Sequence, residues 1–234
     1  MSERAVILAG GRGRRLAPYT AILPKPLMPL TEGKSIIEHV LVGIASAGIS
    51  DVTITLGYLG HLIEAIVGGG EQFGLRVVYT REDHPLGTAG PLSLLEHVTE
   101  SDRILVVNGD TFTDLDYREV LDQLQGSVEA VITCVERTIN IDYGVIQFDN
   151  AGHLANYDEK PEISMVVSTG IYGLRGSSLD LVQPGKRMDM PDLLRALQEN
   201  GRPVVCHVSD CEWEDLGRAE DIAALQQQLP SNVD

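Results

Sequence analysis

The chain has 234 residues, of which 43% are hydrophobic, and its formal net charge is −16 at pH 7. It has no run of eighteen apolar residues and no signal-peptide pattern at its N-terminus, so we expect a cytoplasmic protein without a membrane partner. The three cysteines, Cys134, Cys206 and Cys211, lack C-x-x-C spacing and indicate neither a disulfide framework nor a zinc site.

The first half of the chain alternates apolar strands with helices. Strands are predicted over 4–9, 52–56, 75–79 and 103–107, and helices over 35–47 (ended by Gly48), 60–67, 89–98 and 117–125. Buried strands separated by helices are typical of a mainly parallel sheet that is covered on both faces.

The second half has more strands and fewer helices. Strands are predicted over 130–134, 144–148, 166–174 and 203–207, turns at 150–152 and 173–177, helices over 189–199 and 218–228, and a frayed tail over 230–234. We therefore expect an α/β three-layer sandwich with a mainly parallel, Rossmann-like central sheet and a mixed, more antiparallel second half. Residues 1–234 are expected to form a single domain with two halves, about 1–125 and about 126–228.

The first predicted strand runs directly into Gly10-Gly11-Arg12-Gly13-Arg14-Arg15. Glycines let a backbone approach a ligand closely, and successive amides in such a turn can bind an anion. Residues 1–25 carry a net charge of +4, whereas the rest of the chain carries −20. A small basic loop on an acidic protein indicates a site for one small anion, and it argues against a nucleic-acid partner, which needs a broad basic face.

Three other interpretations of this loop are weaker. A P-loop is excluded because no Gly-Lys-Ser/Thr follows, and a dinucleotide-binding G-x-G-x-x-G fails because Leu16 stands at the third glycine position. A plain tight turn explains the glycines but not the added arginines and Pro24-Lys25-Pro26.

The ordered run from Leu8 to Thr20, followed by Pro24-Lys25-Pro26-Leu27, resembles the signature of the sugar-1-phosphate nucleotidylyltransferases. The resemblance extends over about residues 4–228 and implies the nucleotide-diphospho-sugar transferase fold, with nucleotide bound by the first half and sugar phosphate by the second. It implies catalytic roles for Arg15 and Lys25. It also implies nucleotide contacts from Leu8, Ala9, Gly10, Gly11, Gly13 and Arg14. Many relatives carry a C-terminal β-helix domain, which we do not expect here.

Two acidic motifs are candidate metal ligands. Asn108-Gly109-Asp110 follows the fourth strand, where ligands of open α/β sheets gather, and an aspartate there can hold Mg²⁺. Trp213-Glu214-Asp215-Leu216-Gly217 resembles the family's W-x-D-x-G segment, which implies Asp110 and Asp215 as the Mg²⁺ ligands and Gly109 as a nucleotide contact. Arg218 departs from the threonine that many members have there.

The run Pro85-Leu86-Gly87-Thr88-Ala89-Gly90 is similar to the base-reading loop of mannose- and heptose-1-phosphate guanylyltransferases. It implies nucleotide contacts from Pro85, Gly87, Thr88 and Ala89, with guanine as the base. Related runs also occur in members that use other bases.

Three further segments resemble the family's sugar-phosphate motifs. Tyr143-Gly144 matches a Y-G segment, Glu159-Lys160-Pro161 matches E-K-P, and Ser168-Thr169-Gly170 matches N-x-G with serine in place of asparagine. The resemblance implies that Tyr143, Gly144, Glu159, Lys160, Ser168, Thr169 and Gly170 bind the sugar phosphate. Because of Ser168, the sugar itself stays open.

The expected reaction is transfer of GMP from GTP to a mannose- or heptose-type sugar 1-phosphate, giving GDP-sugar and pyrophosphate. The alternatives are the same reaction with UTP, dTTP or CTP or an unusual sugar phosphate, and a non-catalytic paralogue that binds nucleotide sugar. Asp114-Leu115-Asp116 also fits the D-x-D of glycosyltransferases, but we interpret it as the start of the next helix. Members of the family are often homodimers or homotetramers.

Overall fold

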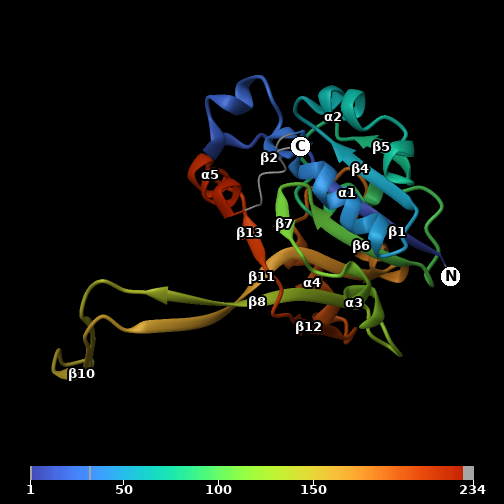
Figure 1. Cartoon of the computed structure of the whole chain (residues 1–234). Coiled ribbons are helices and arrows are strands. Elements are labelled where there is room, and N and C mark those ends of the chain that lie inside the picture. The colour runs from blue at the N-terminus through green and yellow to red at the C-terminus, as the bar shows by residue number, and fades with distance from the viewer. Residues whose placement is uncertain (1, 32, 229–234) are drawn as a thin grey trace.

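The computed structural model describes residues 2–31 and 33–228, and the tail expected at 230–234 lies outside them (Figure 1). Its centre is a seven-stranded sheet with the order β12-β8-β11-β6-β1-β4-β5. These strands are β1 (Glu3–Ala9), β4 (Asp51–Leu56), β5 (Arg76–Arg81), β6 (Arg103–Asn108), β8 (Ala130–Asn140), β11 (Glu162–Arg175) and β12 (Val204–Val208).

The pairing of these strands confirms a mainly parallel sheet with a mixed second half. On β1, Val6 pairs in parallel register with Thr53 of β4 and with Val106 of β6. Strand β11 runs antiparallel to both of its neighbours, β6 and β8, whereas β8 and β12 are parallel to each other. The carboxyl ends of β1, β4 and β6 therefore share one edge of the sheet.

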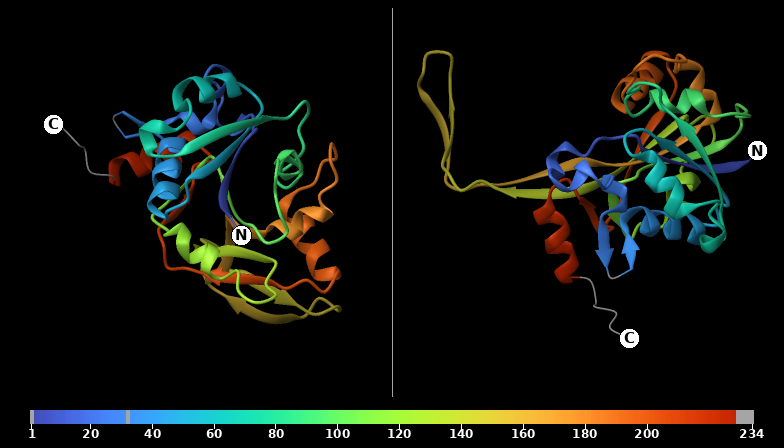
Figure 2. Two further views of the ribbon diagram at one scale, coloured as in Figure 1. Left: turned by 90° about the vertical axis from the view of Figure 1, so that its right-hand side faces the viewer. Right: turned by 90° about the horizontal axis from the view of Figure 1, so that it is seen from above.

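The helices cover both faces of the sheet, as expected (Figures 1 and 2). Ile7 of β1 packs in one apolar cluster with side chains of α1 (Ile36–Ser46), α2 (Gly60–Val67) and α3 (Tyr117–Asp122). Its neighbour Val6 points to the opposite face and packs with α4 (Met190–Glu199). A third cluster joins α5 (Ala219–Gln228) to Leu16 beside the glycine loop. Within the described residues, no helix has the length and apolar character that crossing a membrane requires.

Helix α1 begins and ends as its sequence indicates. Ser35 and Glu38 form a reciprocal capping box at its start, and Gly48 has a φ of +76° just beyond its end. The prediction of a helix over 89–98 is wrong, because only a short 3-10 helix forms at Gly90–Leu94. Leu95 is extended, and the carbonyls of Glu96 and His97 accept hydrogen bonds from Arg4 instead of continuing a helix. Helix α3 also ends earlier than predicted, at Asp122.

The second half contains longer strands than the sequence pattern indicates. Strand β11 continues through the turn expected at 173–177 as far as Arg175, because it is paired there with β6. The small strands are β2 (Pro29–Thr31), β3 (Lys34–Ser35), β7 (Thr111–Thr113), β9 (Val145–Phe148), β10 (Leu154–Asp158) and β13 (Trp213–Asp215). We did not predict β10, because all five of its residues are exposed and carry no burial signal.

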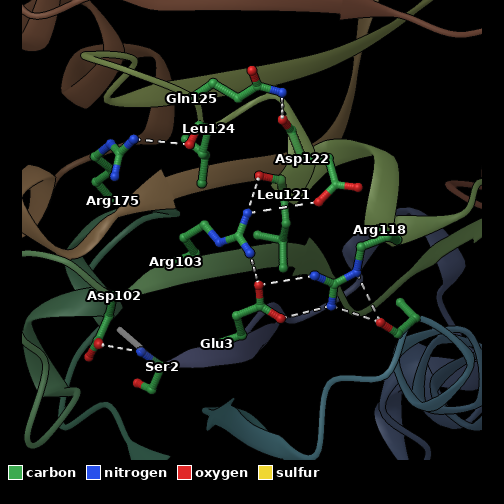
Figure 3. A network of polar contacts seen from close by, with 11 residues as sticks. Ser2, Glu3, Asp102, Arg103, Arg118, Leu121, Asp122, Leu124, Gln125 and Arg175 are labelled. Carbon is green, nitrogen blue, oxygen red and sulfur yellow. Dashed lines mark hydrogen bonds and ion pairs between the residues drawn. The ribbon is translucent and has the colours of Figure 1, made fainter.

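A polar network joins the amino ends of β1 and β6 to α3, away from the glycine loop (Figure 3). The carboxylate of Glu3 accepts hydrogen bonds from the guanidinium groups of both Arg103 and Arg118. Arg118 also donates to the carbonyl of Ala47 after α1. The hydrogen bond from Arg118 and the charges of both arginines hold the pKa of Glu3 below its usual value. The network thus fixes the amino ends of these strands, and the candidate site lies at their carboxyl ends.

Candidate active site

The glycine loop, residues 10–13, leaves the carboxyl end of β1 and enters a 3-10 helix at Arg14–Leu16. Glycine is required at position 13, because its φ is +57° and the amide of Leu16 donates to its carbonyl. The hydroxyl of Thr20 donates to the same oxygen at 3.0 Å. These contacts fix the backbone that carries Arg14 and Arg15.

A pocket of about 270 Å³ lies over this loop. Eight predicted site residues line it together with Pro26 and Gly217: Leu8, Ala9, Gly11, Gly13, Arg14, Arg15, Lys25 and Asp110. Arg12, the remaining cation of the loop, lies over the ring of Tyr58, 5.5 Å from its centroid. Glycine backbone and three cationic side chains together suit a polyphosphate.

Lys25 lies between two carboxylates at this pocket. Its Nζ is 2.5 Å from Oδ2 of Asp110 and 3.5 Å from Oδ1 of Asp215, and the residue is only 6% exposed. Nη2 of Arg15 is 3.6 Å from Oδ2 of Asp215. The structure thus brings together the four residues that the sequence assigned to catalysis and metal binding.

Strand pairing explains why two distant aspartates meet. Asp110 directly precedes β7, and β13 pairs antiparallel with β7 so that Asp215 lies opposite Thr111. Gly217 then lets Arg15 reach Asp215, because a Cβ at position 217 would come within 2.8 Å of the Arg15 guanidinium. The glycine of the W-x-D-x-G segment therefore has a steric role.

Asp110 and Asp215 are the side chains that could hold a divalent cation. Among residues 2–31 and 33–228, no group of three or more His, Cys, Asp or Glu side chains is placed to bind a metal ion. Mg²⁺ is usually bound by one or two carboxylates while substrate phosphates and water complete its shell. The donor set, two carboxylates beside a polyphosphate-type pocket, fits Mg²⁺.

A second pocket, of about 330 Å³, continues from the first and shares Leu8, Gly11 and Asp110 with it. The predicted residues Gly10, Pro85, Gly87 and Thr88 line it, together with Thr55, Glu82, Pro91, Asn108 and Arg187. The glycine loop and the base loop (residues 83–92) therefore face one continuous cleft. The volume beside the base loop suits a flat base attached to a polyphosphate in the first pocket.

The base loop is held by the segment that precedes α4. The amides of Ala89 and Gly90 donate to the carbonyl of Met188, and the amide of Met188 donates to the carbonyl of Leu86. The hydroxyl of Thr88 accepts from the amide of Met190 at 2.7 Å. Ala89, which is fully buried, therefore supports the loop with its amide, whereas Gly87 and Thr88 line the pocket.

Glu82 is a pocket residue that the sequence analysis missed. Its Oε2 accepts a hydrogen bond from the amide of Leu86 at 2.8 Å, and its Oε1 lies against Gly10, where a Cβ would be 2.2 Å away. Burial raises the pKa of this carboxyl. The position of Glu82 just before the base loop could have indicated that it lines the pocket. Arg187 also lines this pocket, but the segment that carries it has no recognisable motif.

The segment Ser168–Gly170 lies where β11 changes register, beside the carboxyl end of β6. Gly170 has a φ of +78° and packs so closely on Asn108 that a Cβ would lie 2.3 Å from its side-chain nitrogen. The hydroxyl of Thr169 donates to the carbonyl of Thr133, and its own carbonyl accepts from the indole of Trp213. Thr169 is thus buried and engaged, while the hydroxyl of Ser168 contacts that of Tyr172 at 3.2 Å.

The remaining sugar-phosphate candidates lie elsewhere. Tyr143-Gly144 and Glu159-Lys160 face each other on a projection formed by β8, β9, β10 and β11 (Figure 1). A Cβ on Gly144 would lie 3.0 Å from Oε2 of Glu159, so the two motifs do meet each other. Among the described residues, however, neither motif contributes to either pocket of the cleft.

Asp114 and Asp116 of the alternative D-x-D motif have structural roles. Asp116 caps α3 by accepting from the amide of Arg118 at 2.9 Å, which confirms that it opens the next helix. Asp114 accepts from the amide of Glu212 at 2.7 Å and thereby supports the approach of β13.

Residues 4–232 match the family model described as nucleotidyl transferase. A UTP–glucose-1-phosphate uridylyltransferase of Synechocystis is 29% identical over 93% of this chain and 61% of its own length. A mannose-1-phosphate guanylyltransferase of Mycobacterium tuberculosis is 30% identical over 98% of this chain and 65% of its own length. The chain thus spans about three fifths of the length of these curated relatives.

Solved structures show the same fold. A putative glucose-1-phosphate thymidylyltransferase from Bacillus anthracis superposes with a TM-score of 0.77 at 23% identity, covering 100% of this chain and 97% of that one. HddC from Yersinia pseudotuberculosis complexed with GMP-PN superposes with a TM-score of 0.73 at 24% identity, covering 97% of this chain and 99% of that one.

Proposed function

Because the chain belongs to the nucleotidyl transferase family, we propose that it transfers a nucleotidyl group from a nucleoside triphosphate to a sugar 1-phosphate and releases pyrophosphate. The observation that carries this proposal is the meeting of Arg15, Lys25, Asp110 and Asp215 at the end of the glycine-loop pocket. Cations and carboxylates so arranged neutralise and position phosphates, which is the main requirement of phosphoryl-type transfer.

The nucleophile of this reaction needs no general base. The second pKa of a phosphate monoester is about 6, so a sugar 1-phosphate is largely dianionic at neutral pH. One of its phosphate oxygens attacks the α-phosphorus of the triphosphate, the bond from that phosphorus to the bridging oxygen breaks, and pyrophosphate leaves with the electron pair. No proton has to be moved in this step.

The obstacle is electrostatic repulsion between two polyanions. Two unit charges 4 Å apart repel each other by about 4 kcal/mol at an effective dielectric constant of 20. In this proposal the α-phosphate binds beside Lys25 and Arg15, which line the glycine-loop pocket, and their charges lower this repulsion in the transition state. The amides of the glycine loop bind and orient the rest of the triphosphate.

Asp110 and Asp215 would hold Mg²⁺, which supplies charge neutralisation and orientation of the phosphate oxygens when bound. Lys25 contacts both carboxylates and keeps them at one end of the pocket.

We propose guanine as the base, and the position of Glu82 supports it. A carboxylate accepts hydrogen bonds and donates none when ionised, and Glu82 presents one to the pocket beside the base loop. The Watson–Crick edge of guanine offers two adjacent donors, from N1 and from the 2-amino group. Uracil and thymine offer one donor flanked by two carbonyl oxygens, which a carboxylate repels. GTP is therefore the proposed nucleotide, with UTP, dTTP or CTP as the alternatives.

A mannose- or heptose-type sugar 1-phosphate is the proposed acceptor, with Lys160 binding its phosphate and with Tyr143, Gly144, Glu159, Ser168 and Gly170 contacting the sugar. The two halves of the site, about 1–125 and about 126–228, are proposed to bind nucleotide and sugar phosphate respectively within one domain. Cytoplasm is the proposed compartment, since the three cysteines are free thiols.

The test offers GTP, UTP, dTTP or CTP together with mannose, heptose or glucose 1-phosphate and Mg²⁺. Both nucleotide sugar and pyrophosphate are measured. The proposal expects both products with GTP and a mannose- or heptose-type acceptor. Turnover with a different triphosphate and not with GTP would overturn the proposed guanine specificity but would support the proposed type of reaction. Tight binding of nucleotide sugars without turnover of any pair would indicate the non-catalytic paralogue instead.

A further inference from the structure

Residues 136–166 form an arm that projects from the body of the molecule (Figures 1 and 2). It consists of the outer parts of β8 and β11, which run out of the central sheet, and of β9 and β10 at its end. In the part of the chain that the structure describes, residues 138–164 hydrogen-bond only with one another. Beyond Arg137 at its root, the described part of the arm therefore has no hydrogen bond or ion pair with its own body.

The root of the arm is stiff. Strands β8 and β11 pair in unbroken register from Val135↔Val167 to Asn140↔Glu162, and these stretches contain neither glycine nor proline. At the root, Arg137 lies 5.3 Å from the centroid of the Trp213 ring and forms an ion pair with Glu214 at 3.1 Å. Folding the arm back over its own pocket would require breaking this ladder and the Arg137 contacts.

The end of the arm exposes one apolar face. In the pair β9–β10, Ile146 lies opposite Tyr157 and Phe148 opposite Leu154, and these four side chains are between 54% and 72% exposed. Since residues two apart on a strand share a face, they form a single patch. An isolated two-stranded sheet is marginally stable in water, so this patch needs a partner to cover it.

The arm also carries the missing part of the proposed site. Tyr143-Gly144 and Glu159-Lys160 lie at its elbow (residues 141–144 and 159–161), between the long ladder and the β9–β10 pair. Each chain thus has a nucleotide cleft and the Ser168–Gly170 segment in its body, but two of the three sugar-phosphate motifs on its arm, and those two line neither pocket of the cleft among the described residues. Each site is incomplete within one chain.

Charge indicates what the arm contacts. The arm contains six acidic residues and two basic ones, a net charge of −4. The segment from Arg12 to Lys25, at the glycine loop and just after it, contains four basic residues and no acidic one. The basic surface around the pocket and the acidic arm of another copy are therefore complementary.

We infer that two copies of this chain exchange arms, so that the elbow of each copy completes the nucleotide cleft of the other. This inference rests on the proposed function, since it assigns Lys160 of one chain to the acceptor phosphate bound at the other chain's Lys25. In a twofold-symmetric dimer, the arm of each copy contacts the cleft of the other, so the same two surfaces meet twice. The apolar patch of each arm is then covered by the body of the other copy.

Molar mass in solution tests the exchange without reference to activity. The inference expects a dimer that becomes monomeric when Ile146→Asp and Phe148→Asp are combined. Val208→Asp is the matched control, because Val208 is 53% exposed on β12 of the body, and it should leave the dimer intact. A monomeric native protein, or a double variant that stays dimeric, would overturn the inference.

Mixing two inactive variants tests whether the site is shared. Lys25→Ala disables the body half and Lys160→Ala the arm half, so each variant alone is expected to have little activity. In a heterodimer with exchanged arms, one of the two sites combines an intact body with an intact arm. Equal co-expression should then restore about one quarter of the native activity, since half of the dimers are mixed. Mixed dimers, isolated by two affinity tags, that show no recovery would overturn the exchange.

A photoreactive amino acid at position 143 gives a readout that does not depend on turnover. In dimers assembled from ¹⁴N- and ¹⁵N-labelled chains, exchange expects mixed-isotope cross-links between the elbow and residues 12–25. Cross-links of a single isotope only, with none of mixed isotope, would show that the arm contacts its own chain and would overturn the inference. If the native protein has no transferase activity, the proposed function fails, while these cross-links still decide where the arm docks.

Discussion

The ammonium group of Lys25 lies between two carboxylates, 2.5 Å from that of Asp110 and 3.5 Å from that of Asp215. Lys25 is buried at 6% exposure while both carboxylates remain partly open to solvent. A buried cation held by two carboxylates is preorganised, so it can stabilise developing negative charge without reorienting. This relationship underlies the proposed chemistry.

Replacement of Lys25 by alanine should lower kcat by about 10²-fold, the usual loss when one preorganised donor to a charged transition state is removed. Lys34→Ala is the matched control, because Lys34 is an exposed lysine of β3 outside both pockets. Steady-state kinetics of the two folded variants decide the point. Equal turnover in Lys25→Ala and the native protein would remove Lys25 from the mechanism.

Glu82→Gln should reduce the preference for GTP over UTP, because an amide presents a donor as well as an acceptor to the base. The loss of a charge-assisted hydrogen bond corresponds to a change in kcat/KM of about 10-fold or more. Competition between the two triphosphates measures this ratio directly. An unchanged ratio would mean that Glu82 does not read the base.

The raised pKa of Glu82 adds a pH dependence. In the proposed complex the ionised carboxylate accepts hydrogen bonds from the base, whereas protonation turns one of its oxygens into a donor, and burial shifts this protonation to higher pH than for an exposed glutamate. The KM for GTP should therefore rise as the pH is lowered toward this pKa, and the rise should be absent in Glu82→Gln. KM measured from pH 7 downward in both proteins provides the comparison.

Gly217→Ala should displace Arg15 without unfolding the protein, since the added Cβ would lie 2.8 Å from the end of a flexible side chain. The expected result is a fall in kcat that approaches the effect of Arg15→Ala. In the Arg15→Ala background the same glycine substitution should have little further effect. Additive losses in the double variant would show that Gly217 acts through another contact.

Glu3→Gln should destabilise the fold by about 2 kcal/mol at pH 7, because Glu3 accepts charged hydrogen bonds from Arg103 and Arg118 (Figure 3). The folded-state pKa of Glu3 is depressed, so this stability is present above the unfolded-state pKa and is lost as the pH falls through the folded-state value. Urea midpoints of both proteins should therefore converge in acid. Asp122→Asn is the control, with a weaker contact to Arg103 at 3.8 Å.

Local patterns in the sequence predicted much of the fold. The apolar runs of β1, β4 and β6 and the glycine after α1 are signals contained within a few residues. The short helix at 90–94 and the length of β11 were not predictable in this way, because Arg4 and β6 decide them from distant positions. Tertiary contacts override local propensity at both places.

In the site, too, the features carried by one short segment were predictable, and those that depend on contacts between distant segments were not. The glycine loop and Lys25 were predicted to act together because one short segment carries them, and the meeting of Asp110 with Asp215 followed only from the family resemblance. Its physical cause, the pairing of β13 with β7, depends on strands of three residues with no distinctive pattern. Arg187 and the projection of the arm have no local signal at all.

The central claim is transfer of a nucleotidyl group to a sugar 1-phosphate, and the amount of pyrophosphate formed tests it most directly. We would follow pyrophosphate and nucleotide sugar together in reactions that contain triphosphate, acceptor and Mg²⁺, and in reactions that lack the acceptor. We expect equal amounts of the two products and no pyrophosphate without the acceptor. Pyrophosphate formed without acceptor, or nucleotide sugar formed without an equal amount of pyrophosphate, would contradict it.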